Sequence, residues 1–196
     1  MTEAHGRYSI GLRVRLDVSA AAAYAVFADL DDLRAVNSDV QQARVVGRGP
    51  GGSVELYTEI RACVLWYCRS LRETQRMTFD RGRDGGEVFA TVLPRRGDFR
   101  EGRAHWTFRA AGGSTVLAMT ADLEPAFRVP PLIGPWLVER WLRRETERTA
   151  ANLERLAAAR PPVRAAAGIP AGASSSASAQ DSAGAPASAS GDRRAR

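Results

Sequence analysis

The sequence predicts an α+β fold, in which a seven-stranded antiparallel sheet is combined with two short helices and one long C-terminal helix. Two patterns indicate this class. Apolar residues alternate with polar ones at residues 8–18 and again in six segments between 40 and 124, as in strands with one buried face. After Pro135, apolar residues return at spacings of three and four, which is typical of an amphipathic helix.

The first three elements are a strand and two short helices. Residues 8–18 form the strand. Ser19 is expected to cap a helix at residues 20–28, because a serine hydroxyl accepts a hydrogen bond from a free N–H of the first turn. A second helical piece spans residues 31–36 and ends near Asn37.

Six further strands follow at short intervals. They are expected at residues 40–48, 54–63, 68–79, 87–93, 101–110 and 115–124. The connecting segments are rich in glycine or contain proline, which favours turns. Consecutive strands joined by such short links form an antiparallel meander.

The turns predict the pairing register of two hairpins. A two-residue turn at Gly112 and Gly113 places opposite charges or apolar side chains together in the pairs Arg103–Asp122, Trp106–Met119 and Phe108–Leu117. A four-residue loop at 64–67 does the same in the pairs Glu59–Arg72, Glu55–Arg76, Ile60–Leu71, Val54–Met77 and Cys63–Cys68. A slip by one residue would destroy all of these pairings.

The last helix and the tail set the domain boundaries. Pro135 suits a first helical turn, Val138 and Leu142 belong to the apolar face, and the proline pair at 161–162 ends the helix. In the segment 161–196, 27 of 36 residues are Ala, Ser, Gly or Pro, which leaves too little apolar surface to offset chain entropy. We therefore expect a flexible N-terminus at 1–6, a folded domain at 7–160 and a disordered tail at 161–196.

The basic residues exclude several enzyme classes. All 28 are arginine, so the chain has no lysine for a Walker A motif, for a Schiff base with pyridoxal phosphate or for a lysine general base. Two histidines and two cysteines are too few for a zinc finger or a histidine-rich metal site. We expect no metal and no cofactor, and the net charge of +6 is too dilute to predict a nucleic-acid partner.

The sequence as it stands predicts a soluble chain of the cytoplasm. Its longest apolar run covers residues 20–28, whereas a membrane span needs about 18 residues or more. Residues 1–6 lack the cationic start and apolar block of a signal peptide. The periplasm is the alternative, if an upstream export signal belongs to the chain.

Several short motifs accompany this order of elements. The broad ones are Phe27-Ala28-Asp29, Trp106 and Thr115-Val116, and the narrower ones are Cys63-x4-Cys68-Arg69, Asp98-Phe99-Arg100-x-Gly102, Glu124-Pro125-x-Phe127 and Val129-Pro130-Pro131-Leu132-Ile133-Gly134-Pro135. Over about residues 7–158 the chain resembles the START-like (SRPBCC) superfamily, whose bacterial members include polyketide cyclase/dehydrase-like and coenzyme Q-binding-like proteins. The resemblance implies a helix-grip fold: a curved sheet around the long helix, with an apolar cavity between them for a lipid-like or aromatic molecule.

The strand phases and this resemblance together indicate which side chains meet the ligand. Those expected to line the cavity are Trp106, Phe108, Leu117, Met119, Val138 and Leu142. Those expected at the cavity entrance or at a membrane surface are Val64, Leu65, Trp66, Tyr67 and Trp136. Core packing against the sheet is the alternative for Trp136.

A non-catalytic binding or carrier protein for a lipid, quinone or polyketide-like molecule is the leading hypothesis, and a monomer is expected. His105 is interpreted as a solvated or hydrogen-bonded strand residue on the face opposite the apolar one, with a general base as the alternative, and the sequence has no nucleophile motif. The alternative is a polyketide-type cyclase or dehydratase, in which Tyr57, Arg61 or Arg103 would position the substrate. A ribosome-associated protein is a weaker alternative, because it depends on the arginine excess alone.

Cys63 and Cys68 leave two interpretations open. On adjacent strands their Cβ atoms would lie about 4.5–5.5 Å apart, and a disulfide needs about 3.5–4.5 Å, so only slight closure is required. Such a bond would fix the shape of the apolar hairpin tip and would favour export. The alternative is a pair of buried free thiols, which a reducing cytoplasm favours.

Overall fold

The computed structural model describes residues 2–4, 6–64, 67–127 and 135–160. The chain divides into two units, residues 1–163 and 164–196, and all described residues belong to the first. The tail expected at 161–196 lies outside the described residues, and its disorder stays a prediction.

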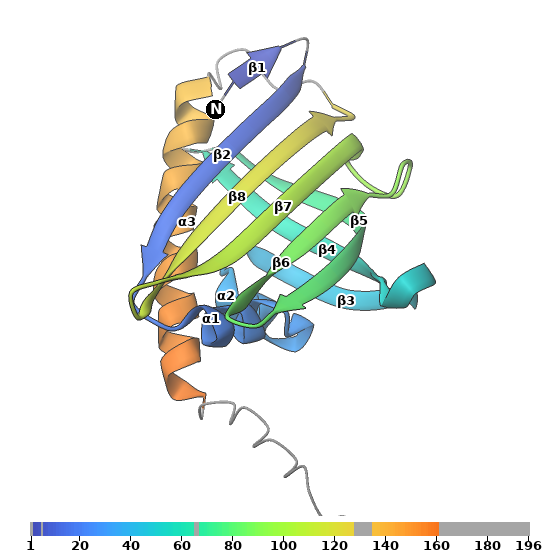
Figure 1. The fold of residues 1–196 in the computed structure, drawn as a ribbon. Coiled ribbons are helices and arrows are strands. Elements are labelled where there is room, and N and C mark those ends of the chain that lie inside the picture. Colours follow the sequence, from blue (N-terminus) through green and yellow to red (C-terminus); the bar gives the residue numbers. More distant parts are fainter. Residues whose placement is uncertain (1, 5, 65–66, 128–134, 161–196) are drawn as a thin grey trace, which may run out of the picture. The chain divides into compact units, whose positions relative to one another are not determined.

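Within the described residues, eight antiparallel strands form one sheet in the order β1-β2-β8-β7-β6-β5-β4-β3 (Figure 1). The strands are β1 (Thr2–Ala4), β2 (Arg7–Leu16), β3 (Val40–Arg48), β4 (Val54–Val64), β5 (Tyr67–Gly82), β6 (Gly85–Val92), β7 (Phe99–Ala111) and β8 (Ser114–Pro125). The six strands from β3 to β8 follow one another in the sheet as they do in the sequence, and β2 pairs with β8. This topology confirms the expected α+β meander.

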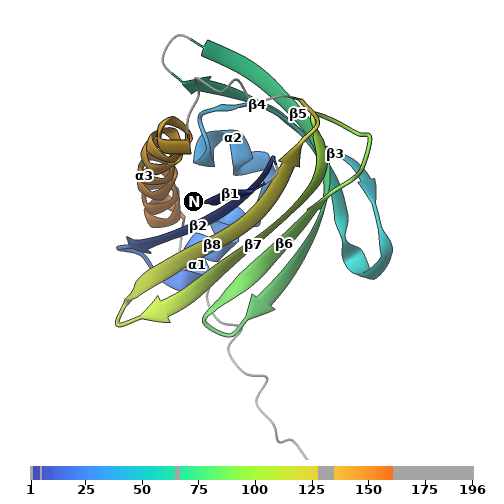
Figure 2. The same cartoon turned by 90° about the horizontal axis from the view of Figure 1, so that it is seen from above.

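The described part of the chain has three α-helices, which lie together on the concave side of the curved sheet (Figure 2). They are α1 (Ala20–Phe27), α2 (Leu33–Val36) and α3 (Pro135–Ala159), and short 3-10 turns add Leu30–Asp32 and Pro50–Gly52. Ser19 caps α1 as expected, because its hydroxyl accepts a hydrogen bond from the N–H of Ala22. The long helix α3 runs past the sheet along its length, which is the helix-grip arrangement (Figure 1).

The sheet has one strand more than the seven expected. Thr2–Ala4, in the segment expected to be flexible, forms β1 and pairs with the start of β2, with Thr2 opposite Ser9. Gly6 allows the chain to reverse here, because its φ of 80° lies in the left-handed region that favours glycine. A strand of three exposed residues carries no apolar alternation, so the sequence pattern could not reveal it.

Both expected hairpin registers are confirmed. Arg103 lies opposite Asp122 across β7 and β8, and Glu59 lies opposite Arg72 across β4 and β5. The second hairpin is tighter than the expected four-residue loop, since Val64 and Tyr67 are themselves paired. Only residues 65–66 remain between these strands, and they lie outside the described residues.

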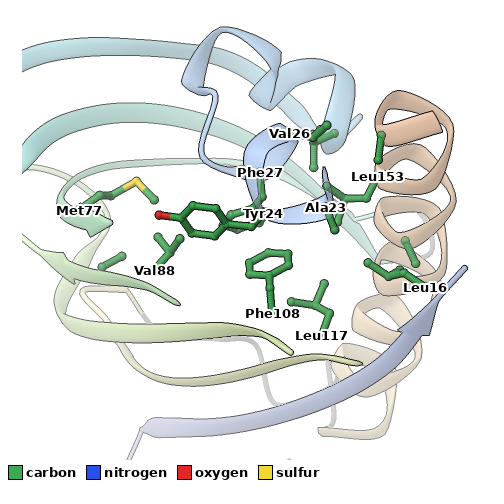
Figure 3. Close-up of a cluster of buried hydrophobic side chains, with 14 of the residues drawn as sticks. Leu16, Ala23, Tyr24, Val26, Phe27, Met77, Val88, Phe108, Leu117 and Leu153 are labelled. Carbon is green, nitrogen blue, oxygen red and sulfur yellow. The ribbon is translucent and has the colours of Figure 1, made fainter. Parts of the chain in front are cut away.

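The hydrophobic core lies at the α1 end of the fold. Phe108 of β7 is 2% exposed and contacts Tyr24 edge-on and Phe27 at an angle, with ring centroids 5.9 and 5.2 Å apart (Figure 3). Leu16 and Leu153 are fully buried in the same cluster and bring β2 and α3 into it. Packing of α1 against the sheet thus closes one end of the space that the sheet encloses.

Candidate ligand-binding site

A cavity of about 450 Å³ lies inside the curved sheet, bounded by α3 and by the α1 and α2 helices. Its walls are mainly aliphatic and aromatic. They include Tyr8, Ile10, Leu12 and Val14 of β2, Ile60 and Ala62 of β4, Leu71 of β5, Trp106 of β7, and Leu117, Met119 and Leu123 of β8. Because successive side chains of a strand point to opposite faces, one face of each strand supplies these residues.

A row of small side chains makes room for the cavity. Ala90, Ala104 and Ala121 lie directly opposite one another across β6, β7 and β8, and all three line the cavity. An alanine row leaves open the volume that larger side chains would fill at these positions. The three alanines are present in the sequence, but they can be recognised as one row only when the pairing register of the three strands is known.

The structure brings together four of the six side chains that the sequence placed in the cavity. Trp106, Leu117, Met119 and Leu142 line it. Phe108 does not, because α1 covers its end of β7 and buries its ring in the core. The side chain of Val138 lies outside the described residues.

The cavity also contains a carboxyl group that the sequence analysis missed. Glu73 of β5 faces inward, and its Oε1 accepts a weak hydrogen bond from the hydroxyl of Thr58, with 3.5 Å between the oxygens. Burial among apolar side chains raises the pKa of Glu73 to about 7, and the Thr58 hydroxyl opposes this only in part. Glu73 shares its strand face with Leu71 and Met77, which was the available signal.

A second carboxyl group approaches the cavity from the helix side. Glu145 of α3 is 7% exposed, and its Oε2 has no hydrogen-bond partner among the described residues. Desolvation and the nearby carboxylate of Asp39 raise the pKa of Glu145 to about 7. Arg148 opposes this shift from 3.8 Å, and the Thr149 hydroxyl does so more weakly.

Arg69 of β5 also lines the cavity, near the β4–β5 hairpin. Its guanidinium carbon lies 3.8 Å from the centre of the Phe127 ring, and Nη2 lies 3.6 Å from Oδ1 of Asp98. These contacts fix the guanidinium and partly neutralise its charge. Its Nε is buried without a hydrogen-bond partner among the described residues.

The three polar residues that the sequence offered for positioning a substrate occupy strand positions that point to the outer face of the sheet. Arg61 is exposed, and Tyr57 is covered on its ring face by Arg44, whose guanidinium carbon lies 4.9 Å from the ring centre. Arg103 borders the cavity but is exposed, and its neighbour Ala104 is the residue that faces inward.

His105 is a hydrogen-bonded strand residue, as its interpretation from the sequence proposed. Its Nε2 bonds to Oε2 of Glu87 at 2.8 Å, and its ring stacks on exposed Phe89. These partners lie on β6, the neighbouring strand. His105 therefore takes no part in the cavity wall.

Cys63 and Cys68 form a disulfide across β4 and β5, at the expected paired positions. Between them, the side chains of Val64 and Tyr67 and the whole of Leu65 and Trp66 lie outside the described residues, as does the side chain of Trp136. Their assignment to a cavity entrance or membrane contact stays a prediction.

No helix in the described part of the chain is long and apolar enough to cross a membrane. In the same residues, no group of three or more His, Cys, Asp and Glu side chains is placed to hold a metal ion.

The family model described as "Polyketide cyclase / dehydrase and lipid transport" matches residues 8–158. None of the curated proteins matches the sequence.

Solved structures with a similar fold come from several bacteria. TTHA0849 from Thermus thermophilus is 18% identical with a TM-score of 0.63, over 78% of this chain and 98% of that one. A START superfamily protein from Mycobacterium smegmatis is 19% identical with a TM-score of 0.57, over 75% and 94%. Zhui aromatase/cyclase from Streptomyces sp. R1128 is 16% identical with a TM-score of 0.62, over 83% and 99%. At these identities the likeness shows the fold alone.

Proposed function

Because the chain belongs to the polyketide cyclase/dehydrase and lipid transport family, we propose that it binds and carries an apolar small molecule in the cavity between sheet and α3. The START-like resemblance inferred from the sequence is confirmed by this membership and by the fold. The observation that carries the proposal is the cavity itself. Its volume of about 450 Å³ and its mainly apolar wall suit a small molecule, since ligand pockets span about 300–1,000 Å³.

Native mass spectrometry of the purified full chain tests this proposal. We expect an added mass that disappears on denaturation, and solvent extraction should recover an apolar compound. A chain that carries no such compound, and that binds no apolar probe after extraction, would overturn the proposal.

A cyclase or dehydratase activity is the second candidate, and Glu73 is the observation that favours it. With a pKa of about 7, its carboxyl group holds a proton near neutral pH and is placed to donate it inside an apolar cavity. Incubation with a poly-β-ketone analogue and product analysis by mass spectrometry would test this activity. Turnover by the native chain, and its loss in Glu73→Gln with ligand binding retained, is the expected result for an enzyme; binding without conversion is the result for a carrier.

A further inference from the structure

Both walls of the cavity carry a glutamate. Glu73 comes from the sheet and Glu145 from α3. Of the described basic residues at the cavity, Arg69 has its charge paired with Asp98 and its face covered by Phe127, although its Nε keeps a free N–H, and Arg103 is exposed. Unpaired carboxylates in apolar surroundings are costly, so acidic charge is the uncompensated charge of this interior.

Glu73 is the less compensated of the two. Among the described residues no cationic side chain lies within 4.0 Å of its carboxylate, whereas Glu145 has Arg148 at 3.8 Å. In the described part of the chain, the side-chain hydrogen bond that Glu73 accepts comes from Thr58 and is at the long limit of 3.5 Å. The other charged groups that line the cavity are Arg69 on the same strand, Arg103 of β7 and Glu145 of α3, and Asp39 lies near Glu145.

We infer that the cavity selects an apolar ligand that carries a basic amine, and that the ammonium group binds the carboxylate of Glu73. This inference rests on the proposed binding function. An ammonium supplies both the positive charge and the N–H donors that Glu73 lacks, and their attraction is strengthened by the low polarity of the walls. A carboxylate ligand would instead be repelled by both glutamates.

Binding of an ammonium ion to Glu73 should depend on pH in a definite direction. When an ammonium ion binds a protonated Glu73, the carboxyl group releases one proton to solvent and an ion pair forms. Affinity for the amine therefore increases from pH 5 to pH 8, until the amine itself loses its proton. A neutral alcohol of equal length gains nothing from this ionisation.

Three probes with the same ten-carbon chain test the inference: decylamine, 1-decanol and decanoate, titrated into the delipidated full chain at pH 8. We expect decylamine to bind at least about tenfold more tightly than 1-decanol, and decanoate to bind most weakly. In Glu73→Gln the preference for the amine should disappear, whereas Glu73→Asp should keep part of it. Glu59→Gln removes a carboxylate that pairs with Arg72 on the outer face and should leave the preference unchanged.

The outcomes separate this inference from the proposed function. If decylamine and 1-decanol bind equally to the native chain, or if Glu73→Gln keeps the preference, the amine inference fails and the binding function stands. If none of the three probes binds, the proposed function itself fails. Retained 1-decanol affinity in Glu73→Gln serves as the check that the variant has folded.

Discussion

The guanidinium of Arg160 donates a hydrogen bond to the carboxylate of Asp29, with 2.6 Å between Nη2 and Oδ2. The same group contacts Asp32 and donates to the backbone carbonyl of Ala25. These contacts fix the C-terminal end of α3 to the end of α1 and to the segment that follows it. Leu153 and Ala157 near that end of the helix belong to the hydrophobic core, so this attachment supports the packing of the core.

Replacing Arg160 with alanine should therefore destabilise the fold. All three acceptors would lose a charged donor, and we expect the free energy of unfolding to fall by about 1–2 kcal/mol, since the group is partly exposed. Urea denaturation measures this loss. Arg155→Ala, an exposed arginine of the same helix, is the matched control and should change stability by less than about 0.5 kcal/mol. Equal midpoints for both variants would contradict the prediction.

Stability should decrease as the pH rises from 5 to 8. Glu73 and Glu145 have pKa values of about 7 in the folded chain, above the ordinary value of 4.5 that applies when it is unfolded. The folded state therefore holds protons that the unfolded state has released, and stability present below pH 4.5 is lost as the pH passes 7. For Glu73 alone this loss is up to about 3 kcal/mol.

Denaturation of Glu73→Gln across the same pH range checks the assignment. The variant should lose less stability than the native chain between pH 5 and pH 8, because the amide does not ionise. Glu59→Gln, on the outer face, should follow the native chain. A pH profile of Glu73→Gln that matches the native one would show that Glu73 does not carry the effect.

The sequence predicted the sheet more fully than the cavity, and the reason is physical. Register follows from local turn chemistry, so Cys63 could be placed opposite Cys68 from the chain alone. Burial of Phe108 depends on α1, which is distant in sequence, and no local pattern reports such packing. Glu73 was not singled out from the sequence, although its position shares the phase of inward-facing Leu71.

The disulfide between Cys63 and Cys68 should contribute modestly to stability. It closes a loop of only a few residues, so the entropy that it removes from the unfolded chain corresponds to at most about 2 kcal/mol. We expect reduction to lower the melting temperature by a few degrees without loss of fold. Thiol titration in denaturant should find no free thiol after oxidative folding, and two free thiols under those conditions would refute the bond.

A larger side chain in the alanine row should abolish ligand binding while it preserves the fold. Ala104 lies between Ala90 and Ala121 and lines the cavity, so Ala104→Phe adds a benzene ring to the cavity wall. Ala104 also packs against the core cluster, so some neighbouring side chains must adjust, and we expect the melting temperature to fall by a few degrees without loss of the fold. We expect at least about tenfold weaker binding of 1-decanol, since the ring occupies volume that the probe needs.

The matched control for this variant is Ala118→Phe, which adds the same ring to β8 on the opposite face of the sheet. Ala118 pairs with Thr107 and Arg13 and does not line the cavity, so the variant should bind 1-decanol as the native chain does. Weaker binding in both variants would point to a general effect of the added ring on the sheet. Unchanged affinity in Ala104→Phe would place the binding site outside this cavity, because a ring at that position cannot share the space with the probe.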